Sequence, residues 1–406
     1  MVQRRVVITG CGVVTAAGRE LDGFWRSLMA GHCLIRPLTS FSYGDAPLMG
    51  AEVELGAEDA LAPSVDADPF RARCLALALA ATRRAVDDAG LPLGTDERTR
   101  TGVAFATTMG EERQIGDLSE RRIKDGDLAI DAGFFTRTNN HRLAAEVART
   151  YQLGGPALLG ATACSSGNAA IAMAYDLIAE GAVERMVVGG ADTFTRLIYC
   201  GFQRMGALSA SICKPFDRRR DGVSFGEGAG VLVLESLDGA RRRGARIRAE
   251  IAGYGISNDA HHVTAPGPHG EGFVRAIDQV LAMTGIAREQ IDYVSAHGTG
   301  TPYNDAGESE MMVKAFGARA KDVPISSIKS MIGHTNGAAS AIEAVACALA
   351  LERGEVPPTA SLEEPDPGFD LDYVPKVGRK HPVSTCLSLA AGFGGYNVCI
   401  ALRRAP

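Results

Sequence analysis

One cysteine of this chain stands where a thiol could act as a nucleophile. Cys164 lies in "GATACSSGNAA" (160–170), among small residues and directly before a predicted alanine-rich helix. A thiol at the start of a helix faces unpaired N–H groups and the positive end of the helix dipole, and both favour the thiolate. The small neighbours leave room for a bulky acyl group, so Cys164 is a candidate nucleophile. A lone cysteine is more often a small buried apolar residue, and that alternative stays open at this point.

Two histidines and a lysine occur in loops that follow predicted strands. His297 ends a hydrophobic run in "SAHGTGTPYND" (295–305) and enters a Gly/Thr turn, the position where α/β folds display catalytic groups. Lys329 and His334 lie in "SSIKSMIGHTNGAA" (326–339). Each of these residues, taken alone, could instead have a structural role.

A glycine-rich loop near the C-terminus supplies the remaining candidates. "AAGFGGYN" (390–397) places Gly392 and Gly394 on either side of Phe393. Glycines this dense indicate either a tight hairpin or backbone N–H groups that must approach a ligand closely. Together with the thiol, the imidazoles and the lysine they form a constellation for acyl transfer. A thiolate that attacks a thioester develops an oxyanion, and each N–H donor aimed at it lowers the barrier by about 2.7–4 kcal/mol.

The elements that must position these residues follow an α/β pattern. Short β-branched runs alternate with longer stretches of helical periodicity, which is typical of layered α/β folds. The order of predicted elements across residues 1–245 recurs across 246–406, although no residue-level repeat is visible. We therefore expect two similar halves, the first with the cysteine and the second with the histidines, the lysine and the glycine loop. Residues 36–70 and 108–136 are rich in turn residues and charges, and we expect surface loops there.

Composition and missing motifs argue against several classes of protein. The chain of 406 residues has a net charge of −6, which gives no support for nucleic-acid binding. Its nine cysteines form no C-x-x-C pair, so neither a disulfide scaffold nor a metal site is expected. No apolar run reaches the length of a membrane span, and the N-terminus reads as a first strand rather than a signal peptide, so we expect a cytoplasmic protein. The G-x-G-x-x-G loop of nucleotide-binding folds is absent.

Seven segments make the chain resemble the β-ketoacyl synthases, the condensing enzymes of fatty-acid and polyketide synthesis within the thiolase superfamily. They are "RRVVITGCGVVTAAG", "TACSSG", "KPFDRRRDGVSFGEGAGVLVLE", "AHGTGTPYND", "SSIKSMIGHTNGAASAIEAVACALALERGEVPPTASL", "DLDYVP" and "AGFGGYN". No single segment is specific, but their order along nearly the whole chain is. The resemblance implies a thiolase-like, duplicated five-layer α-β-α-β-α sandwich, which agrees with the repeated order of elements.

The resemblance also implies a mechanism. Cys164 takes an acyl chain from the phosphopantetheine arm of an acyl carrier protein. Malonyl-carrier protein then loses CO₂, and its enolate attacks the acyl group on the cysteine. His297 and His334 hold the malonyl thioester carbonyl, while the backbone N–H groups of Cys164 and Phe393 hold the acyl carbonyl. The implied chemistry uses no metal and no cofactor of the enzyme, since the substrates arrive on the carrier's phosphopantetheine.

Supporting roles follow from the same resemblance. Phe393 is expected to be a gatekeeper that moves to admit the extender unit, and Lys329 to orient the site through a pair with Glu308. The other residues expected to support the site are Gly392, Gly394, Asp305, Thr299 and Thr301. Because carrier proteins are acidic, Arg71 and Arg73 at the start of a predicted helix are candidates for docking, although an ordinary exposed helix start explains them at least as well.

Some segments favour the ketosynthase α subunits of type II polyketide synthases over the elongating synthases of fatty-acid synthesis. The latter typically end in Phe-Gly-Phe-Gly-Gly-Thr-Asn, whereas here Ala391 replaces the first phenylalanine and Tyr396 the threonine. Such α subunits form heterodimers with a chain length factor, a homologue that lacks the cysteine. "TACSSG" and the short loop "ALSASICKPFD" (207–217) are similar to polyene-forming enzymes.

Three alternatives are weighed against that assignment. One is a homodimeric elongating synthase of fatty-acid synthesis. Another is a non-catalytic dimer partner, which would have no reason to keep the cysteine, both histidines and the lysine. The third is a degradative thiolase, but its second catalytic cysteine in a Cys-Gly-Gly context is missing, since Cys386 and Cys399 lie within strand-like runs.

Overall fold

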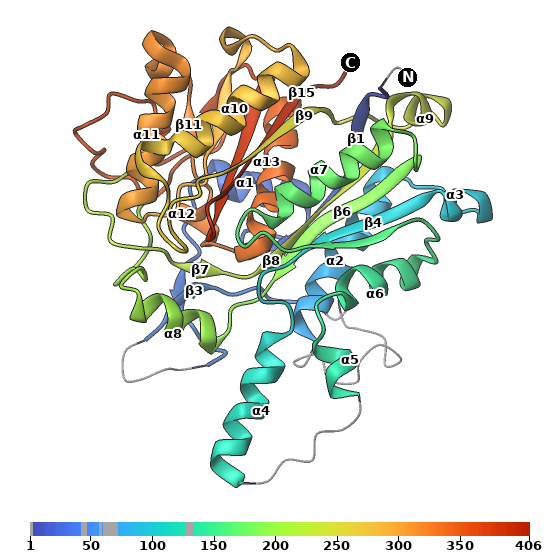
Figure 1. Ribbon diagram of the computed structural model, residues 1–406, viewed down its shortest axis with the longest axis horizontal. Coiled ribbons are helices and arrows are strands. Elements are labelled where there is room, and N and C mark those ends of the chain that lie inside the picture. The colour runs from blue at the N-terminus through green and yellow to red at the C-terminus, as the bar shows by residue number, and fades with distance from the viewer. Residues whose placement is uncertain (1–2, 42–46, 57–58, 60–71, 127–132) are drawn as a thin grey trace.

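Strands from both halves of the chain join one ten-stranded mixed sheet (Figure 1). The computed structural model describes residues 3–41, 47–56, 59, 72–126 and 133–406. The sheet has the order β11-β10-β14-β15-β9-β1-β8-β6-β4-β5. Its strands are β1 (Val6–Thr15), β4 (Thr101–Ala106), β5 (Ala157–Gly160), β6 (Arg185–Asp192), β8 (Gly228–Ser236), β9 (Ala249–Asn258), β10 (Tyr293–Ser295), β11 (Ile325–Ser326), β14 (Thr385–Gly392) and β15 (Tyr396–Arg404).

The two halves of this sheet have the same topology. Outward from the centre, the strands of each half come in the order first, fifth, fourth, second and third along the chain. In both halves the fifth strand is antiparallel to its two neighbours, and the outer pairs are parallel. The halves meet where β1 pairs with β9. The duplication predicted from the order of elements is therefore confirmed, and the predicted boundary at 245/246 lies between α9 (Leu237–Arg242) and β9.

Helices lie between the two halves of the sheet and on their outer faces, so that the fold has five layers. α7 (Ser166–Ala179) and α13 (Ala339–Arg353) pack against each other and against strands of both halves. The side chains of α13 are buried all round from Ala339 to Leu351, as expected of a helix in a central layer. On the outer faces, α2 (Arg73–Ala89) and α6 (Arg142–Tyr151) cover the first half, while α10 (Glu271–Thr284) and α11 (Pro302–Phe316) cover the second. One hydrophobic cluster contains residues of both halves, so the halves share a core.

The expectation that residues 108–136 form loops is wrong. This region contains α4 (Glu112–Asp125), which extends away from the layers, and α5 (Phe134–Thr138) (Figure 1). Gln114 is the only buried side chain of α4. A helix that mainly faces solvent needs no wide apolar stripe, so its charges resemble those of a loop.

The remaining elements connect these layers. They are α1 (Leu21–Met29), β2 (Arg36–Pro37), β3 (Met49–Ala51), α3 (Thr95–Thr99), α8 (Arg196–Arg204), β7 (Phe225–Gly226), α12 (Lys329–Ile332), β12 (Glu355–Val356), β13 (Arg379–Lys380) and several single turns of 3₁₀-helix. Within the described ranges, no helix combines the length and apolar character that crossing a membrane requires.

Candidate active site

Cys164 lies in a sharp turn between β5 and α7. Ala163, directly before it, has a left-handed backbone (φ +52°) that residues other than glycine rarely adopt. The hydroxyl of Ser166 fixes the turn, because it accepts a hydrogen bond from the Thr162 N–H (2.8 Å) and donates one to the Ala163 carbonyl (2.5 Å). The turn presents the thiol directly before the N-terminus of α7, as the sequence predicts.

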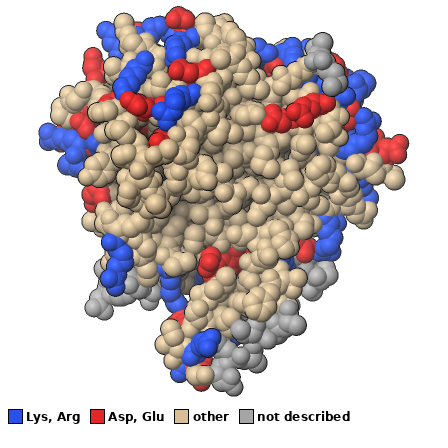
Figure 2. Space-filling model, in the orientation of Figure 1, with Lys and Arg blue, Asp and Glu red and all other residues tan. Residues whose placement is uncertain are grey.

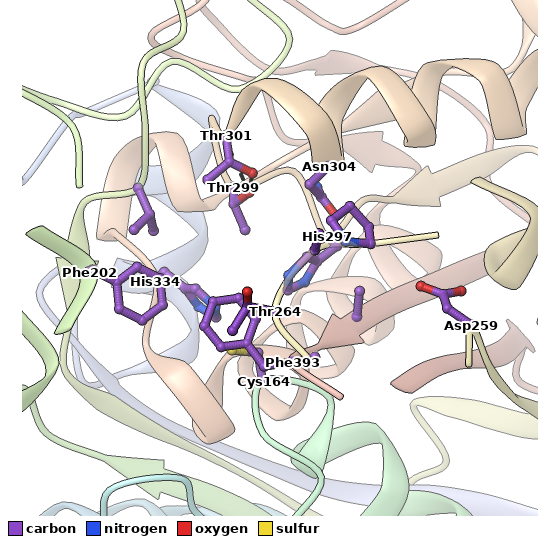
Figure 3. Close-up of a pocket in the computed structure, with 15 residues that line it drawn as sticks. Cys164, Phe202, Asp259, Thr264, His297, Thr299, Thr301, Asn304, His334 and Phe393 are labelled. Carbon is purple, nitrogen blue, oxygen red and sulfur yellow. Dashed lines mark hydrogen bonds between the residues drawn. The ribbon is translucent and has the colours of Figure 1, made fainter. Parts of the chain in front are cut away.

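A pocket with a cavity volume of about 90 Å³ lies in front of this thiol (Figure 3). The predicted cysteine, both histidines, Thr299, Thr301, Gly392 and Phe393 all line it. The rings of His297 and His334 meet edge to face, with centroids 5.5 Å apart and an angle of 86°. Seven lining residues were not singled out from the sequence, namely Phe202, Val223, Asp259, Thr264, Ala265, Pro266 and Asn304. Segments far apart in the chain therefore converge on one pocket.

Two carboxylates of α11 hold the loop that carries His297. Glu308 accepts hydrogen bonds from the backbone N–H groups of His297 (2.7 Å) and Gly298 (2.6 Å). Asp305 accepts from those of Thr299 (3.1 Å) and Gly300 (3.1 Å). The carboxylates lie three residues apart, on one side of the helix. They do not line the pocket, and their contacts position the imidazole through its own backbone.

His334 is held by the strand β7 and its neighbours. Its N–H donates to the Ser224 carbonyl (2.7 Å), and its carbonyl accepts from the Gly226 N–H (3.0 Å). Its ring stacks on Phe225, with centroids 6.4 Å apart. The residue is 2% exposed, so the ring orientation is set by packing as well as by the backbone.

Lys329 pairs with Glu343 of α13, and the predicted pair with Glu308 is wrong. Both oxygens of Glu308 already accept hydrogen bonds from the His297 loop, whereas the ammonium of Lys329 donates to Glu343 Oε1. Both members of this ion pair are almost fully buried. The sequence offered one signal for Glu343, because it is the lone acidic residue in the long apolar stretch "GAASAIEAVACALAL".

Burial sets the protonation of the three pocket residues. Burial, followed by the charge of Lys329, holds the pKa of His297 and of His334 well below the ordinary value, so both imidazoles are neutral. A neutral imidazole keeps one N–H to donate. Burial also raises the pKa of the Cys164 thiol to about 12, against the opposing charge of Lys329. The thiolate expected at the helix N-terminus is therefore not the resting form, because the desolvation of the thiol outweighs the favourable charge of Lys329.

We expect the alkylation of Cys164 to accelerate steadily with pH. Because the thiol pKa is raised to about 12, the reactive thiolate fraction grows about tenfold per pH unit up to about pH 10. Free cysteine in solution, with a pKa of about 8.5, levels off above about pH 9 and serves as the reference. Iodoacetamide labelling with mass spectrometry of the Cys164 peptide measures the rate. A plateau in the same range as free cysteine would contradict the role of burial.

We expect the buried Lys329–Glu343 pair to affect the free energy of unfolding. Lys329→Met or Glu343→Leu alone leaves one buried charge without its partner, and each should lower the free energy of unfolding by about 3–5 kcal/mol. The double variant removes both charges and should regain most of that loss, while condensation stays impaired without the lysine. Denaturant unfolding measures the three variants. Arg149→Met, which breaks the exposed pair with Glu146, is the control and should change little.

Phe393 and its glycines lie over the turn of the cysteine. The Phe393 ring is 37% exposed and stacks on Phe202 of α8, with centroids 5.3 Å apart. A Cβ on Gly392 would come within 2.7 Å of the Thr162 carbonyl oxygen, so the loop can lie directly against the Cys164 turn only with glycine there. Gly394 does not line the pocket, and its N–H donates to the Val263 carbonyl (2.7 Å).

The expectation that Arg73 offers a free cation for docking needs correction. Its guanidinium donates to Glu227 (2.7 Å from Nε to Oε2) and to the Val53 carbonyl (2.6 Å), and its side chain is 18% exposed. Its charge is therefore neutralised inside the chain. The second candidate, Arg71, lies outside the described residues. Among the residues that the structure describes, no group of three or more His, Cys, Asp or Glu side chains could hold a metal ion.

Two protein-family models match this chain, one over each half. The β-ketoacyl synthase N-terminal domain matches residues 3–240, and the β-ketoacyl synthase C-terminal domain matches residues 248–363. The chain belongs to the β-ketoacyl synthase family. This β-ketoacyl synthase is therefore a condensing acyltransferase with the thiolase-like fold, as the sequence predicts.

Relatives from two branches of the family match the synthase over nearly its whole length. The tetracenomycin polyketide synthase ketoacyl synthase alpha subunit of Streptomyces glaucescens is 37% identical, covering 99% of this chain and 97% of the relative. The 3-oxoacyl-[acyl-carrier-protein] synthase 2 of Synechocystis is 36% identical, covering 99% and 98%. Among solved structures, the ishigamide ketosynthase/chain length factor is 38% identical, with a TM-score of 0.93 and complete coverage of both chains.

Proposed function

We propose that this β-ketoacyl synthase is the ketosynthase α subunit of a type II polyketide synthase, and that it joins malonyl units from an acyl carrier protein to an acyl chain held on Cys164. The observation that carries this proposal is the convergence of one thiol and two neutral imidazoles on a single pocket (Figure 3). A thiol can hold an acyl group, and neutral imidazoles can donate hydrogen bonds to a developing enolate.

In the first half of the reaction Cys164 becomes acylated. Its sulfur attacks the thioester carbonyl of the acyl carrier protein, the new S–C bond forms, and the bond to the carrier's sulfur breaks. The proton of the Cys164 thiol passes to the departing carrier thiol. The N–H groups of Cys164 and Phe393 stabilise the oxyanion, which is consistent with the loop of Gly392 lying against the cysteine turn.

In the second half malonyl-carrier protein replaces the first carrier. Its terminal C–C bond breaks, CO₂ leaves, and the electron pair passes to the enolate that His297 and His334 stabilise. The enolate carbon attacks the acyl carbonyl, a C–C bond forms, and the Cys164 thiolate leaves and takes a proton from solvent. Thr299 and Thr301 line the approach to the histidines and support the carrier's phosphopantetheine arm.

The polyketide branch is supported by sequence features and by two structural relatives. Ala391 and Tyr396 depart from the pattern of the elongating fatty-acid enzymes. The ishigamide ketosynthase/chain length factor matches over the full length of both chains. Another similar structure, with a TM-score of 0.90 and 32% identity, is described as a type II polyketide acyl-carrier protein in complex with its ketosynthase. We infer the same two partners, a chain length factor and an acyl carrier protein, for this chain.

Surface features support a homologous partner. β5 is the edge strand of the sheet, with Ala157 exposed and Leu158 and Leu159 half-buried. An apolar edge strand is a template for pairing with another chain. The helices α4 and α5 expose two large apolar residues, Ile123 (84% exposed) and Phe135 (69% exposed). The middle of the face in Figure 2 also carries few charged side chains, which suits a surface that a partner covers.

Reconstitution tests the proposal. The chain is purified alone and together with a homologue that lacks the cysteine, supplied with acyl- and malonyl-carrier protein, and the carrier-bound products are identified by mass. We expect β-ketoacyl products only from the heterodimer. Fatty-acid elongation by the chain alone, as a homodimer, would favour the elongating synthase instead. Binding of the carrier without any condensation would overturn the catalytic assignment. The product masses also report whether the chain is reduced, as in a polyene.

A further inference from the structure

Asp192, at the end of β6, lies outside the roles assigned above. Its side chain is fully buried. Its carboxylate accepts hydrogen bonds from the Thr107 hydroxyl (2.9 Å) and from the backbone N–H groups of Thr108 (2.6 Å) and Met109 (2.8 Å). These donors belong to the loop that follows β4, in the half of the molecule that carries Cys164.

A further donor to the same carboxylate comes from the other half of the chain. The N–H of Gly337 donates to Asp192 Oδ2 (2.8 Å). Gly337 follows His334 by three residues and leads into α13. One carboxylate therefore ties the ends of β4 and β6 to the loop that carries a pocket histidine.

The two loops touch backbone to backbone at this carboxylate. A Cβ on Gly337 would come within 2.6 Å of the Thr108 nitrogen and 2.9 Å of Asp192 Oδ2. A Cβ on Gly190 of β6 would come within 2.9 Å of the Gly337 carbonyl oxygen. No side chain lies between the surfaces to absorb a change, so a shift in the carboxylate's bonds displaces the His334 loop directly.

We propose that Asp192 is a positioning residue that holds the His334 loop in register with the half of the active site that carries Cys164. The inference rests on the proposed function. Acylation needs the thiol and its oxyanion donors, and enolate formation needs the histidines. The C–C bond needs both at the correct separation, and a misplacement of about 1 Å can cost about 10²-fold in rate. Asp192 therefore affects whether the enolate reaches the acyl group on Cys164, and it leaves the acylation of Cys164 itself unchanged.

Asp192→Asn is the direct test. Whichever way the amide turns, its NH₂ group faces a backbone N–H, because Oδ1 accepts from Met109 and Oδ2 from Thr108 and Gly337. We expect kcat for condensation to fall about 10–100-fold, with KM for the carrier protein and the rate of acylation of Cys164 close to wild type. The ratio of CO₂ released to product formed, which is one when the steps are coupled, should rise clearly above one.

Two further variants keep the test decisive. Gly337→Ala keeps the aspartate but places a methyl group against the Thr108 nitrogen and Asp192 Oδ2, which pushes the His334 loop away from both. It should raise the same ratio even if Asp192→Asn does not fold. Asp217→Asn is the matched control. Asp217 is also fully buried and accepts three backbone N–H bonds, from Arg219, Glu363 and Glu364, but none of these donors belongs to a loop that carries a pocket histidine. This control should lose stability and keep the ratio at one.

The outcomes separate the inference from the proposed function. A ratio of CO₂ released to product formed that stays at one in both Asp192→Asn and Gly337→Ala would overturn the positioning role. A ratio that rises in Asp217→Asn as well would also overturn it. If the wild-type enzyme with its partner forms no product from malonyl-carrier protein, the proposed function fails instead. Acylation lost together with condensation in Asp192→Asn would mean that the residue serves the whole fold, and it would also count against the inference.

Discussion

Replacing Cys164 with alanine is expected to lower acyl loading and condensation by about 10⁴-fold or more, to the background of the assay. The methyl group cannot form a thioester, and alanine fits the turn because it is smaller than cysteine. The histidine pair is untouched, so slow release of CO₂ from malonyl-carrier protein should persist. Intact-protein mass after incubation with an acyl-carrier protein measures loading, and product mass measures condensation.

Cys33→Ala is the control for that experiment, since Cys33 is also a free and half-buried thiol but does not line the pocket. It should load and condense as the wild type does. Elongation that survives in Cys164→Ala would show that another group carries the acyl chain, and the catalytic assignment would then collapse.

Replacing His297 with alanine should separate the two halves of the reaction. Cys164 and its oxyanion donors remain, so acyl loading should stay within a few-fold of wild type. Loss of one hydrogen-bond donor to the enolate should lower condensation by about 10²–10³-fold. Because the pKa of His297 is held well below its ordinary value by burial and by Lys329, this histidine does not titrate around neutrality in the wild type. The ratio of the wild-type to the variant condensation rate should therefore not change with pH in that range. Single-turnover loading and steady-state condensation measure the two effects.

The matched control for the histidine is His32→Ala, since His32 does not line the pocket. Both reactions should proceed at wild-type rates in that variant. Loss of loading together with condensation in His297→Ala would indicate that the histidine acts on the thiol, and would contradict its place in enolate stabilisation.

The duplicated fold could be predicted because it depends on local patterns. Cys386 and Cys399 were predicted to lie within strand-like runs, and the structure has them in β14 (Thr385–Gly392) and β15 (Tyr396–Arg404). A run of apolar residues forms a buried strand wherever it occurs in the chain. The α4 helix was missed for the converse reason, because its partner is mainly solvent and leaves no apolar stripe to read.

Residue partnerships across the two halves could not be predicted. Lys329 was matched to Glu308, yet its acid is Glu343, which lies on another helix. Asp192 and Gly337 were not singled out at all, although they join the two loops of the site. Such contacts depend on how α13 packs between the halves of the sheet, and no spacing along the chain encodes that packing.

The order of residues is enough to identify the groups that this protein brings to its chemistry: the thiol of Cys164, the imidazoles of His297 and His334, and the strand pattern that repeats in each half. Short motifs carry that information because a nucleophile and its turn are local. The protonation state of those groups, in contrast, follows from the assembled fold. Burial makes the thiol and both imidazoles neutral, and desolvation is a property of the assembled core rather than of any segment within it.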